Sequence, residues 1–367
     1  MKFYTRNETR KINVGGVVIG GGSPVSAQSM TNTDTRDWKA TVKQIKELEE
    51  AGCEIVRVSL PDMEAAQNVC AIKKNIKIPL VADIHFDYRI ALEAIRQGVD
   101  KLRINPGNIG GKDRVEAVVK EAKAANIPIR IGVNAGSLQS VRGLSGSDGN
   151  SARAQGLVKA AMEHIEILES LKFYDIAVSL KASNIAATVE AYKIFAGKRN
   201  YPLHLGITES GSIFSGTIKS SAGLGIMLYE GLGDTIRISL TANPVEEVKA
   251  AYLLLQSLEL RSAGVEIISC PTCSRTEVDL IKIVSQLENE VSKMKSLKKL
   301  KTPLKIALMG CVVNGPGEAK DADFGIAGGK NTGALFKNGK IIGRLDPKDW
   351  VKKLVEMIKT EVKRLDS

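Results

Sequence analysis

Four residues whose side chains bind metals stand in two groups in the C-terminal third of the chain. Cys270 and Cys273 form a C-x2-C motif, and Cys311 is followed seven positions later by Glu318. Two thiolates three positions apart can bind one metal ion or one edge of a metal cluster, and a distant third thiolate completes the chelate. A carboxylate binds iron less firmly than sulfur does, so a substrate could displace it. The pattern predicts a metal centre that takes part in a reaction.

The other cysteines and the hydropathy define the compartment that we expect. The 367 residues include only five cysteines, and no apolar run follows the basic N-terminal segment. This favours metal or redox chemistry in a reducing compartment over a disulfide framework. Cys53 and Cys70 lie in apolar helical contexts and are expected to be buried side chains. No 18 apolar residues follow one another, so we expect a cytoplasmic protein without a membrane span.

A second set of polar residues recurs in short β-rich runs before residue 241. In each run alternate positions are apolar, and the positions between them are polar or charged. Because successive side chains of a strand face opposite sides, the apolar set should pack under helices and the polar set should share one interior. This interior set comprises Arg57, Asp83, His85, Arg103, Asn105, Arg130, Asn134, Lys181, His204, Arg237 and Ser239, with Glu209 just beyond its run.

The charges of this interior set are unequal. Five cations share it with Asp83 and, at the rim, Glu209. Unpaired buried cations each cost several kcal/mol, so the excess predicts an anionic ligand. Arginine suits paired phosphate oxygens, and a diphosphate is the ligand that we expect. The alternative, in which internal ion pairs hold the fold together, has too few acids of the right parity.

The runs alternate with helical patterns and predict a (β/α)8 TIM barrel. Strands are expected at 25–30, 54–59, 79–83, 101–105, 129–134, 175–181, 203–209 and 235–240, and a glycine-rich hairpin at 14–25 should cap them. The last helix should begin at Pro244 behind an Asn243 cap and stop near Gly264. The segments 135–152 and 210–225 should be loops of a substrate lid, the first of them flexible. Backbone amides and hydroxyls of the second could cradle a phosphate, and its Lys219 either contacts phosphate or is simply solvated.

The remaining residues predict a small α+β domain, with domains at 1–263 and 264–367. A strand at 265–269 leads into Cys270, an amphipathic helix covers 275–294, and a strand at 304–309 leads to Cys311. The helix would place the cysteine pair at its N-terminus, where thiolates are favoured. A hairpin around Asn338-Gly339 and a terminal helix after Asp346-Pro347 complete the domain.

The charge of the chain and the order of its predicted helices and strands indicate which partners it could bind. A run of six lysines at 293–305, between the second and third cysteines, forms either a solvated face or a docking surface for an acidic electron carrier. An aromatic content of 4% and the absence of a groove-reading module argue against nucleic acid, despite a net charge of +11. The chain leaves the last barrel helix on the side opposite the strand C-termini. We therefore expect a head-to-tail homodimer in which the partner's C-terminal domain closes each barrel mouth.

Five segments have distinctive sequences: 81–85 (VADIH), 102–107 (LRINPG), 233–241 (GDTIRISLT), 270–273 (CPTC) and 311–318 (CVVNGPGE). Together they resemble the 4-hydroxy-3-methylbut-2-enyl diphosphate synthases of the non-mevalonate isoprenoid pathway, in their bacterial two-domain form. The resemblance runs essentially end to end and implies a 4Fe-4S cluster held by Cys270, Cys273, Cys311 and Glu318. It implies reductive opening of 2-C-methyl-D-erythritol 2,4-cyclodiphosphate, with two electrons from reduced flavodoxin or ferredoxin and loss of water.

The same resemblance implies roles for the interior set. Glu209 would handle a proton near the reacting carbons, and Glu318 would give way to a substrate oxygen. Asp83, His85 and His204 would either bind substrate or orient a neighbouring cation. The residues that would hold the diphosphate are Arg57, Arg103, Arg130, Lys181 and Ser239, assisted by Asn105 and Asn134.

Three other functions stay open on the residues alone. Three structural cysteines around zinc would make the chain an anion-binding protein without redox activity. Cys270 and Cys273 alone would make a dithiol oxidoreductase, which leaves Cys311 and Glu318 without a role. A barrel enzyme that needs no reductant could use the C-terminal domain as a lid.

Overall fold

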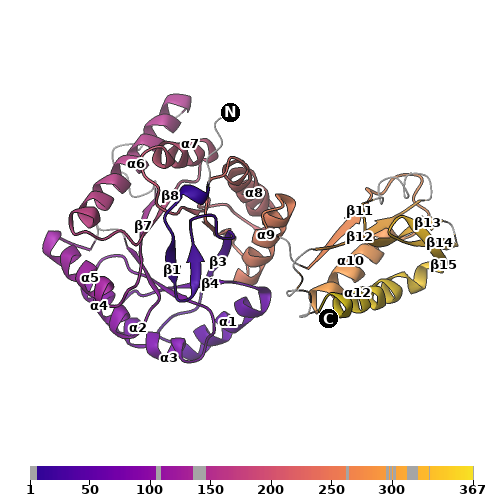
Figure 1. Cartoon of the computed structure of the whole chain (residues 1–367), viewed down its shortest axis with the longest axis horizontal. Coiled ribbons are helices and arrows are strands. Elements are labelled where there is room, and N and C mark those ends of the chain that lie inside the picture. The colour runs from indigo at the N-terminus through magenta and orange to yellow at the C-terminus, as the bar shows by residue number, and fades with distance from the viewer. Residues whose placement is uncertain are drawn as a thin grey trace. The chain divides into compact units, whose positions relative to one another are not determined.

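The computed structural model describes residues 6–104, 109–134, 146–261, 264–294, 297, 300, 303–311, 321–329 and 331–366. The chain divides into two compact units, Met1–Arg261 and Ser262–Ser367, and each is a folded body with its own core (Figure 1). Asn105 and Glu318, both predicted site residues, lie outside the described residues.

The first unit is a parallel barrel surrounded by helices (Figure 1). A parallel bridge between Val178 and Leu203 joins the two ends of the sheet, so the ring of strands closes and the (β/α)8 fold class is confirmed. The strands run in the order β8-β7-β6-β5-β4-β3-β10-β9. They are β3 (Ser26–Met30), β4 (Ile55–Ser59), β5 (Leu80–Asp83), β6 (Lys101–Ile104), β7 (Ile129–Asn134), β8 (Ile176–Lys181), β9 (His204–Leu205) and β10 (Thr235–Ile236).

The last two barrel strands are shorter than the alternation predicted. β9 and β10 pair over two residues each, and one further ladder bond runs from Arg237 N to Leu205 O at 3.0 Å. Glu209, which was expected to close a strand, has a left-handed backbone with φ of 55°. A left-handed residue cannot continue a strand, so the chain leaves the sheet before reaching it.

The helices bury apolar residues against the strands in one continuous core. Their starts follow local sequence: the side chains of Asp37, Asp62 and Asn184 each accept a hydrogen bond from the backbone amide three residues later. Asn243 caps the helix at Pro244, as predicted. The helices are α1 (Trp38–Ala51), α2 (Met63–Gln67), α3 (Val69–Lys73), α4 (Tyr88–Arg96), α5 (Lys112–Ala124), α6 (Gly146–Ser170), α7 (Ile185–Ala196), α8 (Ile213–Tyr229) and α9 (Pro244–Ser257).

Three predictions about helix extent were wrong. The segment 210–225 is mostly α8, and two of its glycines are packing positions: a Cβ on Gly216 or on Gly223 would lie 2.7 Å from the side chain of Leu240 or of Ile207, respectively. α6 begins at Gly146, so helix occupies the end of the predicted loop 135–152, whose residues 135–145 lie outside the described chain. α9 ends at Ser257 rather than near Gly264, and Glu259 just beyond it is left-handed.

An N-terminal hairpin closes the floor of the barrel. It consists of β1 (Ile12–Val14) and β2 (Val17–Ile19), and its turn is formed by Gly15 and Gly16, both with positive φ. The hairpin therefore begins two residues earlier than predicted and ends well before residue 25. Its buried side chains pack against the innermost inward-facing positions of three barrel strands. The cluster contains Ile12, Val14, Ile19, Ile55, Val81 and Ala177.

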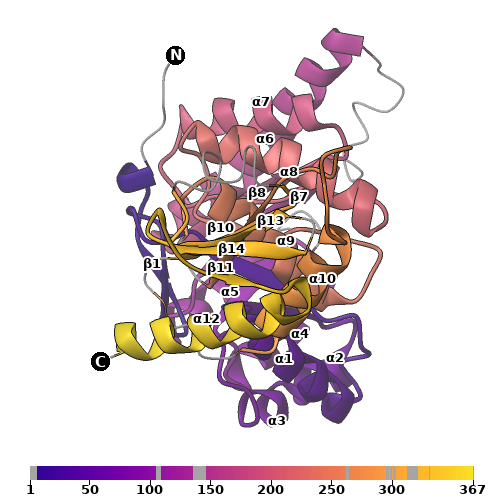
Figure 2. The same ribbon diagram turned by 90° about the vertical axis from the view of Figure 1, so that its right-hand side faces the viewer.

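The second unit is a five-stranded mixed sheet with two helices packed together (Figures 1 and 2). β11 (Val265–Ser269), β12 (Leu304–Met309) and β13 (Phe324–Gly329) are parallel, and β14 (Thr332–Lys337) and β15 (Lys340–Leu345) continue the sheet antiparallel. The helices α10 (Leu280–Ser292) and α12 (Trp350–Asp366) bury one core with the sheet. The predicted turn at Asn338-Gly339 is confirmed, since both residues have positive φ.

The start of α10 corrects one prediction about the cysteine pair. Asp279 caps the helix, and Leu280 is its first residue. Cys270 and Cys273 therefore lie in the connection between β11 and α10, not at a helix N-terminus. The terminal helix does follow Asp346 and Pro347, as predicted, after a short 3-10 turn.

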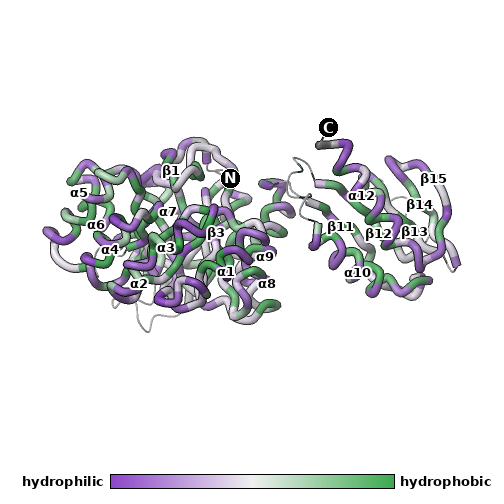
Figure 3. Tube along the Cα trace, turned by 90° about the horizontal axis from the view of Figure 1, so that it is seen from below, coloured by the Kyte–Doolittle hydropathy of each residue, from purple (hydrophilic) through white to green (hydrophobic). Residues whose placement is uncertain are grey.

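Hydrophobic and hydrophilic residues alternate along the helices of both units (Figure 3). None of the helices that the structure describes is both long and apolar enough to cross a membrane.

Candidate functional site

Asp83 is a buried carboxylate on the inner face of the barrel, held between two arginines. Its Oδ1 accepts a hydrogen bond from Arg103 Nη1 at 3.0 Å, and its Oδ2 lies 3.5 Å from Arg57 Nε. Burial alone would raise the pKa of Asp83, but the charges of Arg57 and Arg103 outweigh it and hold that pKa below its usual value. Asp83 is therefore ionised at neutral pH and orients both guanidinium groups.

Three more cations lie fully within the interior. Arg130 is 0% exposed; its Nη1 donates to Gln28 Oε1 at 3.2 Å, while its Nε and Nη2 have no hydrogen-bond partner among the described residues. Lys101 is likewise 0% exposed, and Lys181 is 6% exposed. Burial, followed by repulsion from neighbouring cations, lowers the pKa of all three well below the usual values. The same causes lower the pKa of Arg57 to about 9, against the opposing charge of Asp83.

Two glycines leave the space that the side chains of Arg103 and Lys181 occupy. A Cβ on Gly132 would lie 2.4 Å from Arg103 Nε, and one on Gly206 would lie 2.6 Å from Lys181 Nζ. The carbonyl of Gly132 also accepts a hydrogen bond from Arg103 Nη2 at 3.2 Å. Both positions face inward on strands or strand ends, so the lack of a side chain there is part of how the interior holds its charges.

Sequence reasoning missed two charged residues of this interior. Lys101 stands two positions before Arg103 on β6, so the parity that selected Arg103 also selects Lys101. Glu247 comes from α9, and no strand pattern could have indicated it. Its Oε1 lies 3.5 Å from Arg237 Nη2 and accepts a hydrogen bond from Leu240 N at 3.1 Å. Even with Glu247 included, six buried or half-buried cations face two carboxylates.

The predicted residues at the carboxyl ends of the strands are more exposed. His85 is exposed, and its Nε2 lies 3.2 Å from Arg103 Nη1, next to the Asp83 contact. Asn134 ends β7 exposed, in register with Lys181 of β8. Ser239 is half-buried beyond β10. These positions form the rim above the buried cations, since the strands run toward them.

Glu209 lies at the same end in a strained conformation. Its side chain is exposed, and its φ of 55° is unusual for a residue other than glycine. Lys219 Nζ donates to the Glu209 carbonyl at 3.2 Å, so this lysine holds the strained turn. Non-glycine residues in the left-handed region cluster at functional sites, and Glu209 fits that pattern.

His204 lies inside the barrel wall. It is 0% exposed, its Nδ1 is hydrogen-bonded to Thr235 Oγ1, and its Nε2 has no partner among the described residues. Burial lowers its pKa strongly, and the charges of Arg130, Lys181 and Lys101 lower it further. His204 is therefore a neutral imidazole at neutral pH.

The three cysteines of the predicted metal centre approach one edge of the second unit. Cys270 directly follows β11 and Cys311 follows β12, and these parallel strands pair up to Ser269 and Leu308. Gly310 N donates to Cys270 Sγ at 3.3 Å, which brings the two cysteine segments together. Cys273 is exposed, and hydrogen bonds from the backbone and side chain of Arg275 lower its pKa. A lowered thiol pKa favours the thiolate that binds metals.

The residues present fit an iron–sulfur group in donor type. Backbone amides directed at sulfur, as from Gly310 to Cys270, are the contacts that stabilise thiolate ligands of such clusters. The described residues hold no group of three or more His, Cys, Asp or Glu side chains in a metal-binding arrangement, and Glu318 is not among them. Cys53 is buried as predicted, whereas Cys70 is only half-buried on α3.

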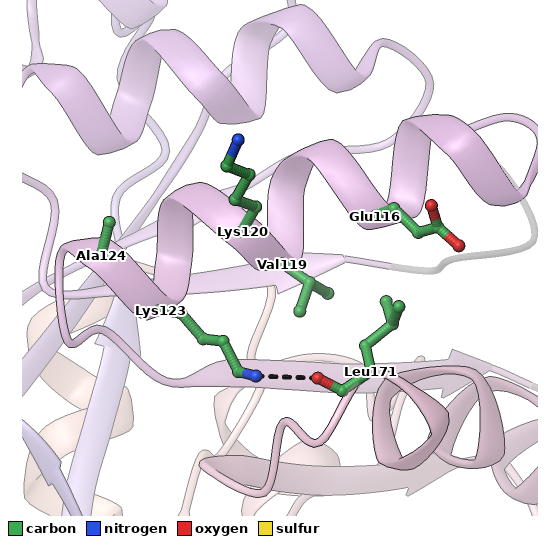
Figure 4. Close-up of a pocket in the computed structure, with 6 residues that line it drawn as sticks. All are labelled: Glu116, Val119, Lys120, Lys123, Ala124 and Leu171. Carbon is green, nitrogen blue, oxygen red and sulfur yellow. Dashed lines mark hydrogen bonds between the residues drawn. The ribbon is translucent and has the colours of Figure 1, made fainter.

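A shallow pocket on the outer side of α5 has a different character (Figure 4). Lys123 Nζ donates to the Leu171 carbonyl at 2.8 Å and ties α5 to the end of α6. The other side chains that line this pocket are Glu116, Val119, Lys120 and Ala124. This pocket lacks the buried cations of the interior and is not a candidate site.

Fold and site together define an α/β-barrel protein with a cation-lined interior and a separate cysteine-bearing α+β unit. The chain belongs to the GcpE family: the model of the GcpE TIM-barrel domain matches residues 9–252, and that of the GcpE protein C-terminal domain matches residues 266–360.

Curated relatives are similar along nearly their whole length. A 4-hydroxy-3-methylbut-2-en-1-yl diphosphate synthase (flavodoxin) of Ruminiclostridium cellulolyticum is 55% identical over 353 residues, 96% of this chain and 98% of the relative. The relatives of that name from Thermodesulfovibrio yellowstonii and Listeria monocytogenes are 57% and 54% identical. They cover 96% and 98% of this chain, and 99% and 97% of their own lengths.

Solved structures are similar in fold alone. Dihydropteroate synthases of Yersinia pestis and Stenotrophomonas maltophilia match with TM-scores of 0.51 and 0.52 at 13% and 14% identity. Each match covers 68% of this chain and 98% of the other. The similarity supports the barrel architecture and says nothing of the reaction.

Proposed function

We propose that this chain is a 4-hydroxy-3-methylbut-2-enyl diphosphate synthase. It opens 2-C-methyl-D-erythritol 2,4-cyclodiphosphate reductively, taking up two electrons and a proton and releasing water, and yields 4-hydroxy-3-methylbut-2-enyl diphosphate. The observation that carries the proposal is the buried excess of cations in the barrel of a chain 55% identical to relatives of that name. A diphosphate supplies the negative charge that this interior lacks.

The barrel residues bind and orient the diphosphate. Arg130 has two donors, Nε and Nη2, that need acceptors, and phosphoryl oxygens are suitable acceptors. Asp83 fixes Arg57 and Arg103, so their remaining N–H groups meet the anion without reorganising. Lys181 and Ser239 complete the set, with Asn105 and Asn134 assisting.

The residues at the rim act nearer the reacting carbons. Glu209, exposed and held in a strained turn by Lys219, moves the proton with its carboxyl group. His85 contacts Arg103 Nη1 through its Nε2 and so positions that guanidinium group from the rim. His204, neutral and bonded through Nδ1, keeps Nε2 for a hydrogen bond to substrate or to a neighbouring cation.

Cys270, Cys273, Cys311 and Glu318 would hold a 4Fe-4S cluster, in a C-terminal domain that begins at residue 264. When bound, such a cluster supplies single electrons at low potential and an iron that accepts an oxygen ligand, neither of which a protein side chain offers. Glu318 would be the oxygen ligand of this set, and a carboxylate binds iron less firmly than a thiolate does.

The partners follow from the same proposal. Reduced flavodoxin or ferredoxin, both acidic electron carriers, would dock at the lysines between Cys273 and Cys311. The protein works in the cytoplasm as a head-to-tail homodimer in which the partner's C-terminal domain closes each barrel mouth. The lysines concerned are Lys293, Lys295, Lys298, Lys299, Lys301 and Lys305.

Anaerobic reconstitution with iron and sulfide, followed by assay of the cyclic diphosphate with a low-potential reductant, tests the proposal. We expect a brown protein with visible charge-transfer absorbance that forms the linear diphosphate only with reductant. A colourless protein with stoichiometric zinc would instead support a structural metal, and turnover without reductant would support a non-redox enzyme. Full activity after Cys311→Ser would support a dithiol mechanism of Cys270 and Cys273.

A further inference from the structure

Lys101 is a buried charged residue for which the proposed function has no role. It is the first residue of β6, its side chain is 0% exposed, and its Nζ has no hydrogen-bond partner among the described residues. An amine buried without a partner costs free energy, because it has lost its water and gained nothing in exchange. A buried residue that destabilises the fold in this way indicates a ligand that binds its ammonium group.

The register of the strands places Lys101 in the layer of inward-facing side chains that is nearest the floor of the barrel. Lys101 is paired with Val81 of β5, and Val81 packs against the floor hairpin. Arg103, two residues further along β6, is paired with Arg130 of β7 and lies one layer nearer the mouth. Lys101 therefore stands on the floor side of the arginine layer.

The groups that act on Lys101 are cations. Arg130 from β7 and Arg57 from β4 repel its charge, and this repulsion adds to the effect of burial. Lys101 in turn acts on His204 of β9. Arg130 also has unpartnered N–H groups within the described residues, at Nε and Nη2, so β6 and β7 both contribute unmet donors to the same interior. An anion reaching this depth would satisfy all of them.

We propose that Lys101 is a further anion-binding residue, whose ammonium group meets the inner phosphoryl group of the diphosphate from the floor side, beneath Arg103 and Arg130. This inference rests on the proposed function and adds a residue to its binding site. The bound anion also reverses the charge balance that disfavours the protonated amine, so Lys101 is charged in the complex. The diphosphate is then bound by Lys101 on the floor side as well as by Arg103 and Arg130 on the mouth side.

The alternative is that Lys101 only fills space in the barrel interior. One variant is measured in two ways, by its melting temperature and by its affinity for inorganic diphosphate. Lys101→Met keeps the length of the side chain and removes its charge. The variant should have a higher melting temperature under either hypothesis, because the unpartnered amine is gone, but it should have a weaker affinity for inorganic diphosphate only if Lys101 binds the anion. We expect the Kd of inorganic diphosphate to rise on the order of 10- to 100-fold, the loss typical of a charged hydrogen bond.

The titration is made by calorimetry on the full-length reconstituted protein, with Lys120→Met as the matched control. Lys120 is an exposed lysine on the outer side of α5, and its variant should bind inorganic diphosphate as the parent does. Lys101→Gln, which keeps a polar group without charge, should lose affinity as Lys101→Met does.

An unchanged Kd for both Lys101 variants would overturn the inference, and so would failure of both variants to fold. Conversion of the cyclic diphosphate by the parent together with an unchanged Kd in Lys101→Met would overturn this inference alone. A parent that neither binds inorganic diphosphate nor converts the cyclic substrate would overturn the proposed function as well.

Discussion

Inward-facing glycines are as much a part of the barrel interior as the cations beside them. Gly132→Ala should weaken the binding of inorganic diphosphate at least about tenfold, because its Cβ would displace Arg103 from Asp83 and from the Gly132 carbonyl. The strain should also cost roughly 1–3 kcal/mol of unfolding free energy. Calorimetric titration and denaturant unfolding measure the two effects.

Gly197→Ala is the matched control for that substitution. Gly197 follows α7 with an ordinary right-handed backbone, and the nearest atom to an added Cβ is the Ile194 carbonyl oxygen at 3.6 Å. Its variant should bind the anion normally and be as stable as the parent or slightly more so. Equal affinities for the two variants would mean that Arg103 can move aside without loss.

At the scale of elements, α9 supplies a carboxylate that connects strands it does not belong to. Glu247 accepts hydrogen bonds from Ser29 Oγ of β3 at 2.8 Å and from Leu240 N at 3.1 Å, and it faces Arg237. Glu247→Gln should cost about 1–3 kcal/mol of unfolding free energy, since it leaves Arg237 without a countercharge and offers an amide where an acceptor is needed. Chemical denaturation measures this loss.

Glu246→Gln gives the comparison for α9. Glu246 is the neighbouring residue of the helix, and its ion pair with Lys249 is largely exposed, at 35% and 54% side-chain exposure. Its loss should change the unfolding free energy by less than about 1 kcal/mol. A Glu247→Gln protein no less stable than the Glu246→Gln protein would show that the buried contacts of α9 contribute little.

The elements also show how far a sequence can be read. Alternation gave six barrel strands within a residue or two at each end, because inward polar and outward apolar residues are a local property of each strand. It included too much of 203–209, since backbone conformation at Glu209 is not encoded in hydropathy. The glycines at 210–225 predict a loop that could cradle a phosphate, although in α8 Gly216 and Gly223 allow close packing. Glu247 joined the site through the fold alone.

Across the whole molecule, the buried cations should make stability depend on pH. Burial and neighbouring cations lower the pKa of Lys101, so between that value and about 10.5 the unfolded chain holds more protons than the folded protein. The free energy of unfolding attributable to Lys101 therefore rises with pH in this window. Lys101→Met should be more stable than the parent at neutral pH, and the difference should shrink as the pH approaches 10.

Comparing Lys101→Met with the parent cancels the contributions of other groups to the pH dependence of the unfolding free energy. Burial raises the pKa of Cys53 to about 12 and raises that of Tyr192, and these groups destabilise the fold as the pH rises, equally in both proteins. Denaturant unfolding at several pH values in this window gives the difference directly. A difference that stays constant with pH would mean that Lys101 keeps its proton in the folded protein.

The proposed head-to-tail dimer makes a prediction about mixed subunits. Arg130→Met disables the barrel of a subunit, and Cys311→Ser disables its cluster domain, so each variant alone should be inactive. If each site combines the barrel of one subunit with the cluster domain of the other, a heterodimer of the two variants has one site in which both parts are intact. Co-refolded or subunit-exchanged mixtures should then recover about a quarter of the parent activity, because half the dimers are mixed and half their sites are whole. If barrel and cluster of the same chain form the site, every site in the mixture carries one defective part, and activity stays at the level of the single variants.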